Sequence, residues 1–420
     1  MLRSTRITVL LLFAAWAVDY IDRLVINLAL PGIGAEFALD YGERGLIVSA
    51  FFVAYALSQI PGGLLADRFG AVRIALAGLI AWSLFTGLTA IAWSFGALLA
   101  IRLLFGFAQG VFPAAAIKLL SERSVPEQRM TANGWMLSSN AFGSFAAAII
   151  ASILLPLWGW RPMFAVIAVL GVVVVVAIKR WMPEALPADV SALDAATAHR
   201  SSSSIGVGIV LRAPAMWCFA LVFFGYDVIV WGIGSWTVSY LNEERGVSIG
   251  TAGLLSIAPT LVAAVAVIVG GRLSDRWEGR PRRIIVPAMI VSAALVIVLP
   301  HTNSVTMFVI VGTLLSGISA LCYMPAFAVP LRSLPASVSG AASSMILFGG
   351  MVAGIAAPLA FGAIVDAASW TTAFGALAVG PLIAILAVLA APQTTERMLA
   401  AVRLDRTADR EETHAHSTVD

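Results

Sequence analysis

Long apolar runs recur along most of the chain, and each is bounded by Gly, Pro, Arg or Asp. Each run spans about 20 residues, which is enough to cross the hydrocarbon core of a bilayer as a helix. Alternating apolar and polar positions, the pattern of membrane strands, are absent. The sequence therefore predicts an all-α membrane protein with twelve transmembrane helices. They are expected at residues 7–33, 45–66, 72–93, 96–120, 131–156, 162–182, 209–241, 249–274, 284–300, 304–331, 338–366 and 370–391.

Two polar stretches divide this pattern. Residues 183–208 are rich in Ser, Ala and Pro, which is typical of a flexible linker. Residues 392–420 are charged and predict a loosely ordered tail. We therefore expect an N-terminal six-helix bundle at 1–182, a cytoplasmic linker at 183–208, a C-terminal six-helix bundle at 209–391 and a cytoplasmic tail at 392–420.

The second half of the chain repeats the first. The segment GLLADRFGAVR at 63–73 corresponds to GRLSDRWEGRPRR at 271–283, and GWRPMF at 159–164 corresponds to SWTTAF at 369–374. The two offsets are nearly equal, so the halves are predicted to be copies related by pseudo-symmetry. Six-helix repeats that face each other across a central site are a transporter architecture.

Composition and charge placement agree with a membrane location. The chain is 60% hydrophobic and 12% charged, whereas soluble domains carry about 25% charged residues. If the N-terminus is cytoplasmic, the predicted outer loops hold only Arg44, Arg161 and Arg245. This asymmetry predicts that both termini lie in the cytoplasm, with the protein in the cell inner membrane. The N-terminus resembles a signal peptide, but apolar character resumes after residue 23, so we expect an uncleaved helix.

Other classes of function find little support. No basic tract is interleaved with aromatic residues, so nucleic-acid binding is not expected. No metalloprotease, P-loop or serine-nucleophile motif is present, so we expect neither an enzyme nor a cofactor. Cys218 and Cys322 lie in apolar runs and read as core residues. A pair of tail histidines, His414 and His416, is interpreted as solvated, with weak metal binding as the alternative. The chain is expected to be monomeric.

The segment DYIDR at 19–23 interrupts the first predicted helix with three charges. Each such group near a helix centre costs about 2.5–3.5 kcal/mol on insertion scales. Asp19 and Arg23 are four residues apart and share a helix face, so they are predicted to pair. Asn27 continues that face, whereas Asp22 points about 100° away from Arg23. We therefore expect the carboxyl group of Asp22 either to interact with a residue other than Arg23 or to carry a proton.

The loop between the second and third predicted helices resembles the signature loop of the major facilitator superfamily. The resemblance rests on the pattern G63-xxx-D67-R68-x-G70-xx-R73, with a weaker copy at Asp275 and Arg276, and it covers essentially the whole chain. In that family the loop is understood as a cytoplasmic latch, so the resemblance implies gating by Gly63, Asp67, Arg68, Gly70, Arg73, Asp275 and Arg276. The alternative is that these charges only anchor helix ends at the lipid headgroups.

The first two predicted helices resemble one branch of this superfamily in particular. YIDR, followed by SAFFVAYALSQIPGGLLADRFG at 49–70, is similar to the anion:cation symporter branch, whose members commonly carry organic anions with protons. The resemblance implies that Arg23 binds the anionic group of the substrate and that Asp22 takes the proton. It also implies that Tyr55 and Gln59 face the transport cavity. A packed aromatic is the alternative for Tyr55.

The chain departs from this branch at several positions. The branch has a Glu seven residues after an Arg in the fourth span, but here Gln109 follows Arg102, and a Gln cannot carry a proton. Acids stand instead at Asp19 and Asp227, where the branch has Asn. We hypothesise that proton coupling has moved to Asp19, Asp22 and Asp227. The alternative for Asp227 is a hydrogen bond to a neighbouring helix.

Further polar residues complete the candidate site. Arg102 is either a second anion contact or a structural tether, and Gln109 lies on its face of the helix. Asn140 is a candidate contact for a substrate hydroxyl. In the second half of the chain, the further candidates for residues that line the cavity are Trp231, Ser235, Tyr323 and Ser344. The expected function is proton-coupled symport of a small organic anion by alternating access. An uncoupled facilitator or exchanger, an exporter and a non-transporting receptor are the alternatives.

Overall fold

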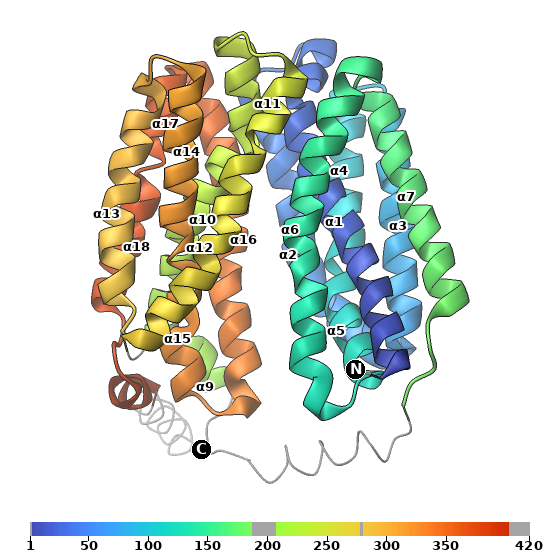
Figure 1. Ribbon diagram of the computed structural model, residues 1–420, viewed down its shortest axis with the longest axis vertical. Helices are drawn as coiled ribbons and strands as arrows, with labels where there is room; N and C mark the ends of the chain where they lie inside the picture. The colour runs from blue at the N-terminus through green and yellow to red at the C-terminus, as the bar shows by residue number, and fades with distance from the viewer. Residues whose placement is uncertain (1, 187–206, 278–279, 403–420) are drawn as a thin grey trace, which may run out of the picture. The chain divides into compact units, whose positions relative to one another are not determined.

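A computed structural model of the protein describes residues 2–186, 207–277 and 280–402, and this part of the chain contains helices and no strand (Figure 1). In the first half the helices are α1 (Arg3–Phe37), α2 (Tyr41–Phe69), α3 (Ala71–Ala90), α4 (Phe95–Gly110), α5 (Phe112–Glu122), α6 (Pro126–Trp158) and α7 (Trp160–Trp181). In the second half they are α9 (Val207–Arg212), α10 (Pro214–Ser239), the π-helix η1 (Tyr240–Glu244), α11 (Ile249–Leu255), α12 (Ile257–Arg276), α13 (Arg282–Val298), η2 (Leu299–His301), α14 (Val305–Ala320), α15 (Tyr323–Ser333), α16 (Ala336–Ala367), α17 (Trp370–Ala376) and α18 (Val379–Ala390).

The predicted twelve-span pattern is present. Within the described residues, eleven helical stretches are long and apolar enough to cross a membrane. The remaining stretch is α1, a continuous helix of 35 residues that carries Asp19, Asp22 and Arg23 at its middle. These charges lower the apolar character of α1 but do not interrupt its helix, and all three side chains are buried.

Five of the expected spans contain a break in the helix. The spans expected at 96–120, 209–241, 249–274, 304–331 and 370–391 are each divided, the second of them at Ala213 between α9 and α10. Each break lies within four residues before a proline, at Pro113, Pro214, Pro259, Pro325 and Pro381. A proline lacks the N–H of the helical ladder, and its ring clashes with the carbonyl four residues earlier. Other prolines, including Pro61 of α2 and Pro358 of α16, lie inside unbroken helices.

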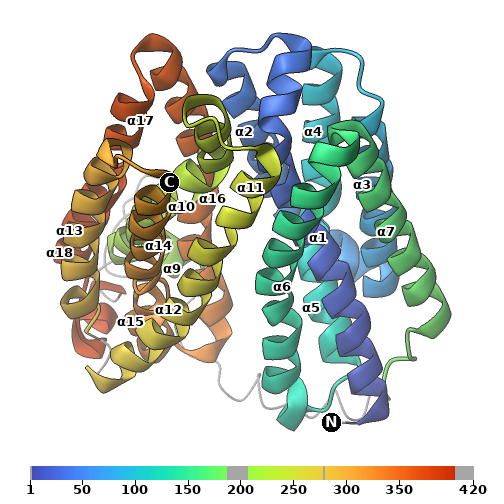
Figure 2. The ribbon, with the colours of Figure 1, turned by 45° about the horizontal axis from the view of Figure 1, so that its top comes forward.

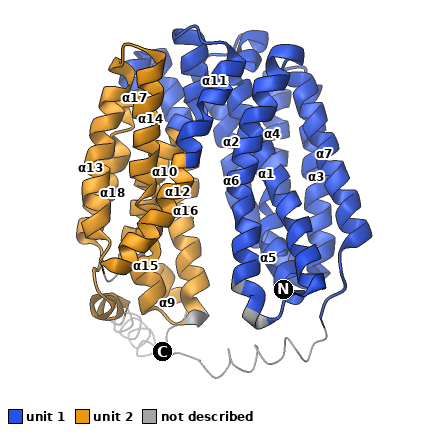
Figure 3. Ribbon diagram, viewed as in Figure 1, with its two compact units in different colours: residues 1–195, 233–261, 358–373 blue, residues 196–232, 262–357, 374–420 orange. Residues whose placement is uncertain are grey.

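Two compact units can be distinguished by packing (Figure 3). One contains residues 1–195, 233–261 and 358–373, and the other contains 196–232, 262–357 and 374–420. The first unit thus includes all of η1 and α11, pieces of α10, α12 and α16, and most of α17, all from the second half of the sequence. The boundaries of the two predicted six-helix bundles stay a prediction. Most of the predicted linker, at 187–206, and the tail from 403 with its two histidines lie outside the described residues.

Close helix contacts in the first unit position the polar centre of α1. The helices α1, α5 and α6 lie side by side in both views (Figures 1 and 2). Glycines allow α2 and α4 to approach backbone to backbone, because a side chain at Gly106 would collide with the carbonyl of Phe51. One turn later, Gly110 lies against the backbone of Tyr55. This packing brings Phe51 and Tyr55 of α2 next to the polar residues of α1 and α4.

A methyl group at Gly106 is expected to destabilise the protein. Gly106→Ala forces α2 away from α4, and such overpacking costs about 1–3 kcal/mol. Thermal denaturation of the detergent-purified protein measures this loss as a lower melting temperature. Gly134→Ala on α6 is the matched control, since a Cβ there meets nothing within 4 Å. If both variants melt at the same temperature, the close approach of α2 and α4 contributes nothing to stability.

Candidate functional site

The polar centre of α1 is organised around Arg23. Its side chain is buried, with 7% of its surface exposed, and its Nη2 lies 3.0 Å from Oδ2 of Asp19. Asp19 itself is 2% exposed. The prediction that these residues pair along one helix face is therefore confirmed. The pair is electrically neutral, which is the arrangement that makes buried charges tolerable in a bilayer.

Gln109 of α4 completes the coordination of this pair. Its Oε1 accepts hydrogen bonds from Nε and Nη2 of Arg23, both at 3.3 Å, and its Nε2 donates to the backbone carbonyl of Asp19 at 3.0 Å. Gln109 is completely buried. An amide can make both contacts at once because it carries an acceptor and a donor. Sequence reasoning placed Gln109 near the site but missed this bridge from α4 to α1.

Three aromatic rings enclose the guanidinium of Arg23. Its Cζ lies 4.6 Å from the ring centre of Tyr55, 4.9 Å from that of Tyr20 and 5.3 Å from that of Phe51. Each distance is within the range of a cation–π contact. Tyr55 is buried, so it both packs in the bundle and contacts the predicted anion anchor. Gln59, one turn further along α2, is half-buried and is not joined to Arg23 by a hydrogen bond in the described part of the chain.

A second buried network lies beside the first. Thr86 of α3 donates to Oδ1 of Asp22 at 2.9 Å, while Oδ2 of Asp22 has no hydrogen-bond partner among the described residues. Arg102 is 1% exposed, donates to Thr89 Oγ1 at 3.3 Å and lies 4.7 Å from the ring centre of Phe105. As the helix geometry predicted, Asp22 does not pair with Arg23. The two threonines on α3, which sequence reasoning did not select, connect to both charged groups.

The two acids of α1 differ in their partners. Asp19 has Arg23 as a direct ion-pair partner. Asp22 accepts one hydrogen bond, from the hydroxyl of Thr86, and forms no ion pair among the described residues. A buried carboxylate of this kind lacks the counter-ion that compensates for lost hydration. The site therefore contains one paired acid and one acid without an ion-pair partner.

Two asparagines extend the set of polar groups. Asn27 on α1 is 4% exposed, and its Oδ1 has no partner within the described residues. Asn140 on α6 is half-buried, and its Oδ1 is likewise without a partner there. One turn beyond it, Gly143 brings α6 against Ala17 and Tyr20 of α1. Asn140 is thus carried by a helix that contacts the α1 segment holding Asp19 and Arg23.

The second unit holds an isolated acid among aromatic rings. Asp227 of α10 is 9% exposed, and the described residues offer it neither a hydrogen bond nor an ion pair. Its Oδ2 lies against Gly350 of α16, where a side chain would collide with it. Phe223 of α10 lies 5.1 Å from the ring centre of Tyr323, which belongs to α15. The remaining candidates of the second half differ in exposure: Ser235 is buried, Trp231 is half-buried and Ser344 is exposed.

The predicted latch loops form ion pairs through their aspartates. Asp67 lies 2.7 Å from Nζ of Lys118 on α5, and Asp275 lies 2.6 Å from Nη2 of Arg332 on α15. Both partners come from corresponding helices of the two repeats, although sequence reasoning selected neither. Gly70 joins α2 to α3 with φ of +91°, a conformation that disfavours any residue with a side chain.

The other predicted gating residues make fewer contacts. Arg68 stacks on the ring of Phe69 at 5.2 Å. A Cβ at Gly63 would lie at ordinary contact distance from Ala114 of α5. In the described part of the chain, Arg73 and Arg276 are exposed and form no ion pair. Within the described residues, the ion pairs of the two loops are made by Asp67 and Asp275, and the gating role of the loop arginines stays a prediction.

Comparison with known proteins agrees with this architecture. The family described as Major Facilitator Superfamily matches residues 12–358 and 237–410. A hexuronate transporter of Bacillus subtilis (strain 168) is 29% identical over 268 residues, which are 64% of each chain, so the match spans just under two thirds of that protein. The "Probable galactarate/D-glucarate transporter GarP" of Escherichia coli (strain K12) is 28% identical over 394 residues, 85% of this chain and 87% of that protein.

Solved structures share the fold. A bacterial homologue of the human lysosomal transporter Spinster, solved in an inward-facing and unoccupied conformation, superposes with a TM-score of 0.76 at 19% identity over 98% of both chains. This likeness concerns the fold alone. The helical spans, the repeated latch loop and the family match over most of the chain lead to one assignment: the chain belongs to the Major Facilitator Superfamily.

Proposed function

We propose that the protein is a secondary active transporter that moves a small organic anion, a sugar acid or another carboxylate, across the inner membrane by alternating access. The observation that carries the proposal is the buried Arg23, whose charge is held by one acid, one amide and three rings. A planar guanidinium suits a carboxylate, because it offers parallel N–H donors. The relatives named for hexuronate and galactarate or glucarate support a sugar acid as the substrate class.

Proton coupling follows from competition for Arg23. Asp19 and a substrate carboxylate would occupy the same face of the guanidinium, so both cannot neutralise it at once. A proton on Asp19 removes its negative charge and leaves Arg23 available to the anion. By linkage, proton binding then strengthens anion binding, and anion binding strengthens proton binding by the same factor. Anion affinity is therefore expected to rise as the pH falls.

A facilitator or exchanger without proton coupling is the second candidate. It is favoured by Gln109, which occupies the position of the family's acid and cannot carry a proton. In that case anion affinity would still depend on Arg23, but an imposed pH gradient would not drive accumulation.

The substrate class can be tested by ligand-induced thermal stabilisation of detergent-purified protein. The panel contains hexuronates, aldarates, aromatic acids and simple dicarboxylates at matched ionic strength, with neutral sugars as controls. A ligand at 100 times its Kd raises stability by about 2.7 kcal/mol. We expect sugar acids to raise the melting temperature and neutral sugars to leave it unchanged. Stabilisation by neutral sugars, or by none of the acids, would contradict the proposed substrate class.

A further inference from the structure

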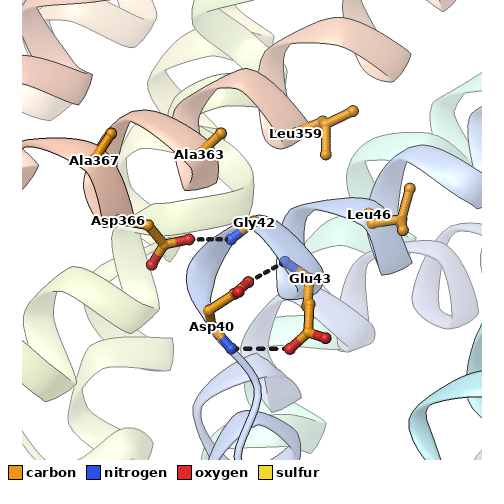
Figure 4. A pocket seen from close by; sticks show the side chains of 8 residues that line it. All are labelled: Asp40, Gly42, Glu43, Leu46, Leu359, Ala363, Asp366 and Ala367. Atoms are coloured by element: carbon orange, nitrogen blue, oxygen red, sulfur yellow. Dashed lines mark hydrogen bonds between the residues drawn. The ribbon is translucent and has the colours of Figure 1, made fainter.

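The first turn of α2 is bound by a carboxylate from near the other end of the sequence. Asp366, close to the C-terminal end of α16, accepts a hydrogen bond from the backbone N–H of Tyr41 at 3.1 Å. It accepts a second one from the backbone N–H of Gly42 at 2.7 Å (Figure 4). The first N–H groups of a helix have no partner within the helix and carry partial positive charge. The contact therefore joins two elements about 325 residues apart through charge as well as hydrogen bonds.

α2 does not need Asp366 to begin its helix. Asp40 accepts a hydrogen bond from the N–H of Glu43 at 2.7 Å, and the Glu43 side chain accepts one from the N–H of Asp40 at 3.1 Å (Figure 4). This reciprocal pair is a complete capping box. Asp366 satisfies additional N–H groups, so its role is to connect α16 to α2 and not to start α2.

An ion pair fastens the same turn of α2 to a third element. Nη1 of Arg44 lies 2.7 Å from Oε1 of Glu243 in η1, the π-helix that ends α10. Arg44 also donates from Nε to the carbonyl of Leu39 at 3.2 Å, which fixes the direction of its side chain. The two side chains of the pair are 11% and 22% exposed. The first turn of α2 is thus held by charged contacts on two sides.

Next to these polar contacts, α2, α10 and α16 pack closely against one another. Gly45 of α2 lies directly against the backbone of Pro358 in α16, where a side chain would collide. Trp236 is completely buried and donates from Nε1 to the carbonyl of Pro358 at 3.0 Å. Tyr41 packs edge-on against Trp236 and Trp370, with ring centres 5.9 and 5.0 Å apart. Trp236 and Trp370 are buried whereas Asp366 is exposed, so the carboxylate lies at the edge of this packing.

We infer that Asp366, Arg44 and Glu243 form a reversible clasp that holds this end of the helices closed and releases when the two repeats separate. The inference rests on the proposed function only in assuming that the repeats move. Asp366 is exposed and Glu243 is partly exposed, so water can replace the partners of both at small cost. With the N-terminus cytoplasmic, as predicted, the clasp closes the outer side, because it follows the far end of α1.

The test is a distance measurement between spin labels, made without substrate or pH gradient. Cys218 and Cys322 are replaced by alanine, and labels are attached at Trp93→Cys and Thr371→Cys, two exposed sites in different repeats. We expect Asp366→Asn and Arg44→Glu each to increase the longer-distance population by about threefold or more. The swap Arg44→Glu with Glu243→Arg is expected to return the distribution to that of the parent.

Asp40→Ala is the matched control, because it removes the side-chain cap of α2, and Asp40 makes no hydrogen bond to α16 among the described residues. If Asp40→Ala lengthens the distances as much as Asp366→Asn, helix capping explains the effect and the clasp is refuted. Unchanged distances in both Asp366→Asn and Arg44→Glu also refute it. Since no substrate is present, these outcomes are independent of whether the transported anion is a sugar acid or whether transport is proton-coupled.

Discussion

Arg23→Ala is expected to lower the affinity for the preferred anion at least tenfold, a loss of about 1.4 kcal/mol. Arg23 is the only cation placed among Asp19, Gln109 and the rings of Tyr20 and Tyr55 in the described structure. Its removal takes away the charge and the parallel donors that a carboxylate needs. Isothermal titration of the purified protein with the best ligand of the anion panel measures the change.

Loss of Arg23 alone also leaves Asp19 buried without a partner. Breaking a buried ion pair on one side costs about 3–5 kcal/mol, so the single variant requires a control for folding. The double variant Asp19→Asn, Arg23→Ala removes both charges and should recover the melting temperature but not the affinity. Unchanged affinity in either variant would remove Arg23 from the binding site.

Asp19→Asn is expected to separate anion binding from the proton gradient. The amide preserves the size of the side chain but leaves the charge of Arg23 uncompensated at every pH. Anion affinity should therefore equal or exceed that of the parent and should no longer change with pH between about 5.5 and 8. Accumulation driven by a pH gradient should fall to the level of a control without a gradient, whereas exchange of labelled for unlabelled anion persists.

Gln109→Glu provides the matched rescue. In the Asp19→Asn background it returns a carboxyl to Arg23 from α4, at a position where Gln109 now lies 3.3 Å away. We expect pH-dependent affinity and gradient-driven accumulation to return together. If Asp19→Asn accumulates the anion as well as the parent does, Asp19 is only a counter-ion and coupling lies elsewhere.

Features set by local spacing could be predicted from the sequence. The twelve spans follow from the lengths of the apolar runs. Asp19 and Arg23 pair as predicted because an interval of four residues places them on one helix face whatever the neighbours are. The same helix geometry correctly predicted that Asp22 does not pair with Arg23. The relation between the repeats was visible because the loop sequence at 63–73 recurs at 271–283.

Features set by packing between helices could not be predicted in this way. Thr86 and Thr89 look like ordinary polar residues of an apolar span, and only the placement of α3 beside α1 and α4 gives them Asp22 and Arg102 as partners. The bridge made by Gln109 depends on the rotation of α4 against α1. The breaks inside five spans could not be located from the prolines that follow them, because other prolines in this chain lie inside unbroken helices.

The contact of Asp366 with α2 was beyond sequence reasoning for a similar reason. Asp366 lies at the end of an apolar span, where an acid is commonly just a solvated helix terminus. Its partners are backbone N–H groups, which leave no signal in a sequence. A repeat pattern did not help either, because the match between the two halves does not pair Asp366 with an acid in the first half.

Proton-coupled transport is decided by uptake of a labelled sugar acid into proteoliposomes under an imposed pH gradient. The ligand is the acid that stabilises the purified protein most, and a protonophore control removes the gradient without changing the membrane. We predict accumulation above equilibrium when the side from which the anion enters is acidic, and only equilibration when the protonophore is present. Uptake that is identical with and without the gradient would contradict proton-coupled transport and leave an uncoupled facilitator in its place.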